Sequence, residues 1–141
     1  CYLLNLVQMK HPKVVKAFLI LCAIIGIYVG AGLLFFPIQF QAQSHIIIGD
    51  NISQLSETRA PGAAVFFTSL VILLGVFRTR WMETSLILSA LFFLSYGIGR
   101  MLSLLIDGMP DQALFAAMII ELLIGLIALV LLIRGKQPQA T

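Results

Sequence analysis

The 141-residue sequence has few charged residues, little cysteine and none of the short motifs that mark soluble enzymes. Only 11% of its residues are charged, whereas 60% are hydrophobic and the mean hydropathy is +1.05. Soluble domains carry about a quarter charged residues, and disordered chains combine low hydrophobicity with high net charge, so both classes are excluded. The chain is therefore expected to be an integral membrane protein.

Cysteine and histidine are too sparse for a metal or redox site. Cys1 and Cys22 are too few for a disulfide framework, and His11 and His45 have no cluster of further ligands beside them. No CxxC, HExxH, Walker or GxSxG motif is present. We therefore expect no metal, no cofactor and no catalytic signature. Because the chain starts at Cys1 rather than Met, we expect a truncated or processed start, with a lipid-modified cysteine as the alternative.

Four apolar segments are long enough to cross a bilayer, which takes about 20 helical residues. They run over residues 14–36, 60–77, 84–106 and 113–133. Pro37 stops the first, Pro61 stands in the first turn of the second, and Gly108 follows the third. The predicted fold is an all-α, antiparallel bundle of four transmembrane helices, spanning residues 14–133 between an N-terminal segment (1–13) and a tail (134–141).

The basic residues predict the orientation in the membrane. Seven of the nine lie before the first helix, between the second and third, or after the fourth. This side is cytoplasmic by the positive-inside rule, so we expect both termini inside. We interpret the net charge of +3 as this topology signal rather than as nucleic-acid binding. The loop over residues 38–59 is then outside, half-buried at the interface, where it could act as a lid. The seven residues are Lys10, Lys13, Lys16, Arg78, Arg80, Arg134 and Lys136.

A polar stripe follows the third segment. Helical spacing places six side chains on one face: Ser85, Ser89, Tyr96, Arg100, Ser103 and Asp107. We do not expect this face to contact lipid. Arg100 lies about 10 Å inside the helix end, where a charge costs several kcal/mol unless it is paired or hydrated. Glu121 of the fourth segment lies about 15 Å deep and within its reach, so we predict an Arg100–Glu121 ion pair in preference to an arginine that snorkels to the interface.

Charged side chains also gather near the outer ends of the segments. Glu57, Arg59 and Asp107 converge there with Tyr96 and Ser103 below them. One interpretation is a polar vestibule that leads down to the ion pair. The other is an ordinary set of interface charges and helix caps, which we favour for Asp107 and for Asp111. Small residues on the first and fourth segments are expected to let helices approach closely: Gly26, Gly30, Ala113, Ala117, Gly125 and Ala128.

Several short motifs carry a family resemblance through their order and spacing. They are residues 56–62 (SETRAPG), residues 96–100 (YGIGR) followed by Ser103 and residues 107–110 (DGMP), and then Glu121. Together they resemble the small bacterial four-helix membrane proteins of domain-of-unknown-function family 4345, over nearly everything from the first helix to Arg134. The resemblance implies an inner-membrane protein without an assigned reaction, whose recurring polar positions match Arg59, Arg100, Asp107 and Glu121.

Three function classes remain open, and we favour the first two. The chain could bind a small amphiphile, lipid or quinone-like molecule between its helices near the outer leaflet. It could instead be an accessory subunit that packs on a larger membrane partner, or on a second copy, through the small-residue faces. In the third class, Glu121 would exchange a proton in a carrier or membrane enzyme. The candidate ligand-binding residues are Arg100, Glu121, Tyr96, Ser103, Arg59, Glu57 and Asp107.

Overall fold

The computed structural model describes residues 11–135, and this part of the chain is mostly helical, without a strand. Four long helices account for most of it: α1 (Pro12–Phe35), α3 (Ile52–Phe77), α4 (Met82–Asp107) and α5 (Gln112–Gly135). A short helix, α2 (Pro37–Ala42), follows α1, and a 3-10 turn, η1 (Thr79–Trp81), precedes α4. The four long helices have the length and apolar composition needed to cross a membrane. The predicted all-α class with four membrane helices is confirmed.

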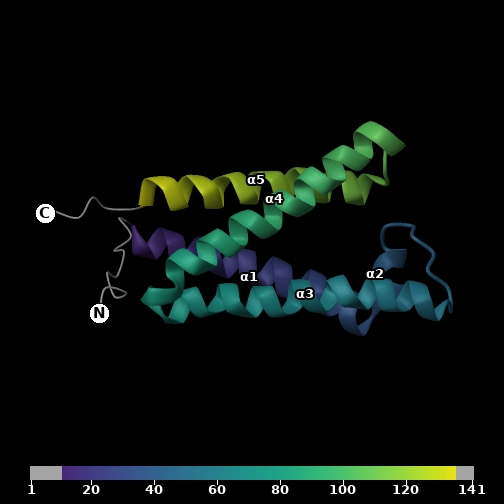
Figure 1. Cartoon of the computed structure of the whole chain (residues 1–141), viewed down its shortest axis with the longest axis horizontal. Coiled ribbons are helices and arrows are strands. Elements are labelled where there is room, and N and C mark those ends of the chain that lie inside the picture. The colour runs from purple at the N-terminus through teal and green to yellow at the C-terminus, as the bar shows by residue number, and fades with distance from the viewer. Residues whose placement is uncertain (1–10, 136–141) are drawn as a thin grey trace, which may run out of the picture.

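The helices associate in two pairs, α1 with α3 and α4 with α5. Figure 1 shows α4 running obliquely across the molecule, where it packs on α3 and joins the two pairs. By contrast, α5 makes no extensive contact with α1 or α3. We call the end that carries α2 and the α4–α5 turn the outer end, after its predicted side of the membrane. The predicted N-terminal segment and tail lie mostly outside the described residues.

The hydrophobic core fills the inner half of the bundle, which is the half opposite the outer end. Its fully buried residues include Leu19, Ile72 and Leu86, one from each of α1, α3 and α4, and Ile124 of α5 packs against them. Burial of this kind contributes about 1.5–3 kcal/mol for each large aliphatic side chain. The core therefore holds the two helix pairs together at the inner half, while the outer half is less tightly filled.

Glycine allows the close approach within each pair. A Cβ atom on Gly30 of α1 would lie 2.5 Å from the backbone nitrogen of Phe66 on α3, and one on Gly125 of α5 would lie 2.9 Å from the backbone nitrogen of Leu94 on α4. These small-residue positions were expected to pack against another helix, and they do so within the chain. They are consequently not free to receive a separate partner.

The ends of α1 and α4 agree with the prediction from the sequence, but the start of α3 does not. The first helix ends at Phe35, just before Pro37, and Gly108 ends α4 with a φ of +99°. The predicted start of the second membrane helix at Ala60 is wrong, because α3 begins at Ile52 and Pro61 lies nine residues further on, inside the helix. The Asn51 side chain explains the early start, since its Oδ1 accepts hydrogen bonds from the backbone N–H groups of Ser53 (3.0 Å) and Gln54 (3.3 Å).

Much of the predicted outer loop over residues 38–59 is therefore helical. Only the segment from residue 43 to residue 51 has no regular structure. Within it Ile48 is buried and Ile47 is exposed, as expected for a half-buried segment. His45 has a φ of +56°, a left-handed conformation that few residues other than glycine adopt and in which histidine is enriched.

Candidate functional site

A cavity of about 600 Å³ occupies the outer half of the bundle. All four long helices line it, and α2 with the following segment lies over its outer end. Most of the lining is apolar, with Ile25, Val29 and Val65 among the aliphatic residues and Phe92 and Phe93 among the aromatic ones. Its size lies within the range of sites for small organic ligands.

The Arg100–Glu121 ion pair lies at this cavity. Arg100 Nε donates to Glu121 Oε2 at 3.0 Å, and the two side chains are 31% and 16% exposed. The predicted pair is thus confirmed, and each charge neutralises the other at a depth where an isolated charge is costly. A guanidinium has four further N–H donors on its two terminal nitrogens. Among residues 11–135 no acceptor engages these donors, so they remain for a ligand.

Tyr96 and Glu57 complete the polar part of the lining. Tyr96 precedes Arg100 by one helical turn, and its ring packs against Phe92 with the ring centroids 4.9 Å apart. Glu57 stands in the part of α3 that precedes Pro61, and it is exposed at the outer end of the cavity. The early start of α3, which the sequence analysis missed, is what brings Glu57 and the neighbouring Thr58 to the cavity.

Three of the predicted site residues do not line the cavity. Arg59 Nη1 donates to the backbone oxygen of Leu34 at 3.2 Å and so ties α3 to the end of α1. Ser103 Oγ donates to Asp107 Oδ2 at 2.8 Å on the exposed end of α4. The structure therefore brings four of the seven residues together, and the vestibule does not extend to these three.

The stripe on α4 faces inward along only part of its length. Ser85 and Ser89 are fully buried. Ser85 Oγ donates to the backbone oxygen of Val71 at 3.2 Å, and Ser89 Oγ donates to the backbone oxygen of Ser85 at 2.8 Å. Ser103 and Asp107 are exposed. At the outer end this face is therefore not covered by another helix of the described chain, because α4 runs obliquely and leaves α3 there (Figure 1).

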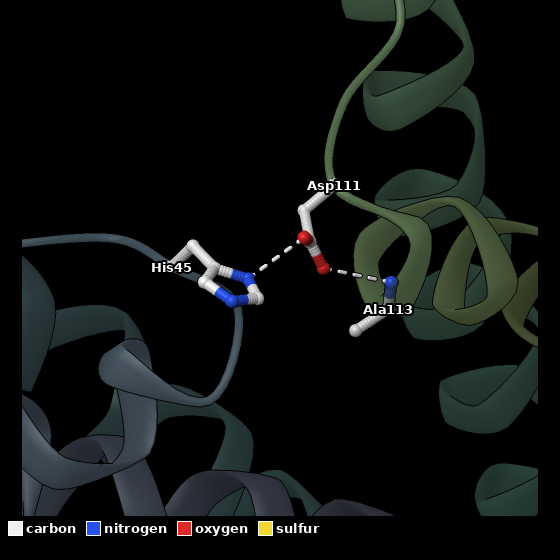
Figure 2. A network of polar contacts seen from close by, with 3 residues as sticks. All are labelled: His45, Asp111 and Ala113. Carbon is white, nitrogen blue, oxygen red and sulfur yellow. Dashed lines mark hydrogen bonds and ion pairs between the residues drawn. The ribbon is translucent and has the colours of Figure 1, made fainter.

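Asp111 connects the outer segment to the start of α5, as Figure 2 shows. Its Oδ1 accepts from the backbone N–H of Ala113 at 2.9 Å, which confirms the predicted cap, and its Oδ2 pairs with His45 Nδ1 at 2.8 Å. These interactions, the Ala113 N–H first and His45 after it, lower the pKa of the Asp111 carboxyl from its usual value. The sequence analysis did not identify this partner of His45, which is 66 positions away in the sequence. Within the described part of the chain no three His, Cys, Asp or Glu residues gather as metal ligands.

The outer segment lies at the cavity, but the sequence analysis missed the helix α2 within it. Phe40 and Gln41 of α2, with Ser44 and Ile46 after it, line the cavity together with Tyr28 of α1. Pro37 was interpreted only as the end of the first helix. A proline is equally suited to the first turn of a new helix, and this signal could have indicated α2.

Comparisons with known proteins place the chain in a family but not in a functional class. No curated protein and no solved structure matches the chain. A family model described as a domain of unknown function (DUF4345) matches residues 14–132. The match covers most of the sequence and reaches into all four membrane-length helices, so the chain belongs to the DUF4345 family.

Proposed function

We propose that this chain binds a small amphiphile in the cavity at the outer half of its helix bundle. The polar end of the ligand contacts Arg100 and Glu121, and its apolar part lies along the aliphatic and aromatic walls. One observation carries the proposal: a cavity of about 600 Å³ in a membrane protein opens onto an ion pair whose arginine retains unused donors.

The open space beside the ion pair supports a binding role over a purely structural one. A pair that served only to hold α4 to α5 would be stabilised best by close packing, since interior side chains normally fill the space around them. Here both side chains line the cavity, and both are partly accessible. In low-dielectric surroundings, a hydrogen bond from Arg100 to a ligand oxygen is stronger than the same bond in water.

The accessory-subunit alternative has less support. It relied on small-residue faces of α1 and α5, but Gly30 and Gly125 already pack against Phe66 and Leu94 of the same chain. No observation on the described residues favours the carrier or enzyme alternative over binding.

The experiment is mass spectrometry of molecules that copurify with the protein extracted in native lipid particles. We expect a bound amphiphile in the wild type, and its loss from Arg100→Leu. Arg59→Leu is the matched control, because Arg59 lies outside the cavity. Since Arg100→Leu leaves Glu121 unpaired, the double variant Arg100→Met with Glu121→Met tests the same loss without an unpaired charge. An empty wild-type protein, or equal ligand in both Arg100 variants, would refute the proposal.

A further inference from the structure

We propose that the cavity is loaded sideways from the bilayer, through a portal between α1 and α5 that is framed by Tyr28 and Ile120. The ligand is then an uncharged lipid dissolved in the membrane whose head group accepts hydrogen bonds, and not a water-borne solute. This inference rests on the proposed function and adds the route of entry and the chemical class of the ligand.

The two portal residues face the cavity and the surroundings at once. Tyr28 and Ile120 both line the cavity, yet they are 62% and 49% exposed. Tyr28 lies seven residues before the end of α1, and Ile120 lies eight residues after the start of α5. At 1.5 Å per residue both are about 10–12 Å below the outer helix ends, inside a hydrocarbon layer about 30 Å thick. At this depth the surroundings are lipid.

The portal lies at a seam where two helices that line the cavity do not pack on each other. Within residues 11–135, α1 packs on α3, α3 packs on α4, and α4 packs on α5. An extensive contact between α5 and α1 would close this ring, and it is missing. Because side chains of both helices line the same cavity, the cavity lies between them in the outer half.

The approach from water is covered in part, with Glu57 exposed at the outer end of the cavity. Ser44 and Ile46 line the cavity on either side of His45, and the hydrogen bond from His45 to Asp111 ties this segment to the start of α5 (Figure 2). Phe40 of α2 packs edge-on against the Tyr28 ring, with the ring centroids 5.7 Å apart. The outer cover therefore also supports one side of the portal.

The depth of the ion pair indicates the ligand class. Arg100 and Glu121 lie about 10–14 Å below the outer ends of their helices, level with the portal. A head group that moves sideways to them crosses hydrocarbon, where a charged group costs several kcal/mol and a neutral polar group costs less. Since Glu121 already neutralises Arg100, the remaining guanidinium donors need an oxygen acceptor and not an anion. Hydroxyl, ester and quinone-type head groups meet these conditions.

The test uses a long-chain fatty alcohol that carries a photoreactive diazirine within its alkyl chain. Phosphatidylcholine vesicles that contain the full-length protein are mixed with vesicles that contain the probe, and the mixture is illuminated after increasing delays. Mass spectrometry then measures cross-links to Phe93 in the cavity. We expect Ile120→Trp to narrow the portal and slow this labelling by about tenfold or more, which corresponds to about 1.4 kcal/mol of added barrier.

Two matched variants separate the portal from other effects. Leu123 is 55% exposed on α5 but does not line the cavity, so Leu123→Trp controls for a new tryptophan in lipid. Ile46→Trp narrows the outer cover instead. Leu123→Trp should label at the wild-type rate, and Ile46→Trp should slow labelling less than Ile120→Trp does. A probe with a sulfate in place of the hydroxyl should label the wild-type cavity about tenfold less than the alcohol.

Each outcome has a distinct meaning. If the wild type is never labelled at Phe93, the proposed function itself fails. If Ile46→Trp slows labelling and Ile120→Trp does not, binding stands and sideways entry is refuted. Equal labelling by the sulfate probe refutes the uncharged ligand class. If Ile120→Trp fails to fold, Ile120→Ala decides the question, because it should accelerate labelling, and an unchanged rate overturns the portal.

Discussion

Two contacts between polar side chains, Arg100–Glu121 and His45–Asp111, differ in depth, and this difference sets what each does. The first lies about 10–14 Å below the outer helix ends, where water cannot replace a lost partner. The second lies at the membrane surface, between the outer segment and the start of α5. Loss of a partner should accordingly affect the stability of the whole bundle in the first case and the local attachment of the outer segment in the second.

A double-mutant cycle tests the coupling of Arg100 to Glu121. Removing one partner leaves an uncompensated charge, so Arg100→Met alone should cost up to about 3 kcal/mol of unfolding free energy, the low end for buried pairs because this pair is partly exposed. Glu121→Gln alone should also destabilise, and the double variant should be more stable than the worse single one. Thermal unfolding in detergent measures all three. Additive losses would show that the two side chains are not coupled.

The pH dependence of stability tests the surface contact. The folded structure lowers the pKa of Asp111 relative to the unfolded chain, where an aspartate titrates at about pH 4. Its stabilising effect is therefore complete above about pH 4 and is lost as the pH falls through the lower folded-state pKa. Asp111→Asn, which can still cap the helix, should flatten the unfolding temperature against pH in this acidic range.

His45→Ala is the companion variant for this measurement. The backbone N–H of Ala113 contributes more to the lowered pKa of Asp111 than His45 does. His45→Ala should consequently remove less of the acid dependence than Asp111→Asn. Equal loss of acid dependence in the two variants would mean that the imidazole, and not the cap, dominates.

At the scale of helices, close contact through glycine makes a sharp prediction for the α1–α3 pair. In Gly30→Ala the new methyl group meets the backbone of Phe66, which cannot rotate away as a side chain can. Overpacking of this kind costs about 1–3 kcal/mol. Gly99→Ala is the control, because no atom lies within 4 Å of its new methyl group. It should be neutral or stabilise by up to about 1 kcal/mol, since alanine is the better helix former. Similar unfolding temperatures for the two variants would contradict the tight α1–α3 contact.

The start of α3 depends on one cap. Asn51→Ala removes the acceptor for the N–H groups of Ser53 and Gln54 and should cost about 1 kcal/mol locally. The first turns should then fray and loosen Glu57 at the cavity. Hydrogen exchange of residues 52–60 should rise in Asn51→Ala and stay unchanged in Asn51→Asp, which retains the cap. Unchanged exchange in both would mean that packing alone holds these turns.

The elements that could be predicted from the sequence are those with local signals. Long apolar runs marked the four membrane helices, Pro37 and Gly108 marked ends, and helix rise alone placed Arg100 level with Glu121. The features missed have weaker or distant causes. Residues 52–59 are mostly polar. A prediction based on long apolar runs therefore places the start of the second helix too late in the sequence. The partners His45 and Asp111 are 66 positions apart and meet only because α5 returns to the outer end. The cavity itself depends on the oblique path of α4, which no local pattern indicates.

For the whole molecule, orientation in the membrane remains a prediction from the positive-inside rule. Single cysteines at Gln43, in the outer segment, and Thr79, between Arg78 and Arg80, should react oppositely with an impermeant thiol reagent on intact cells. We expect labelling at Gln43 and protection at Thr79, in a background where Cys1 and Cys22 are replaced. Cys22 is buried, so alanine, which is small and apolar, is the suitable replacement. The opposite labelling pattern would mean that the protein has the inverse orientation in the membrane.

The pairing of consecutive helices has a consequence for biosynthesis. The contacts between α1 and α3 are complete once Phe77 has left the ribosome, and those between α4 and α5 involve only later residues. Each hairpin can thus be inserted and packed as a unit during translation, with mostly local contacts that form quickly. The α3–α4 and α1–α4 contacts and the link from His45 to Asp111 must wait for the second hairpin. Assembly ends when the two hairpins dock, and the cavity comes into existence in that last step.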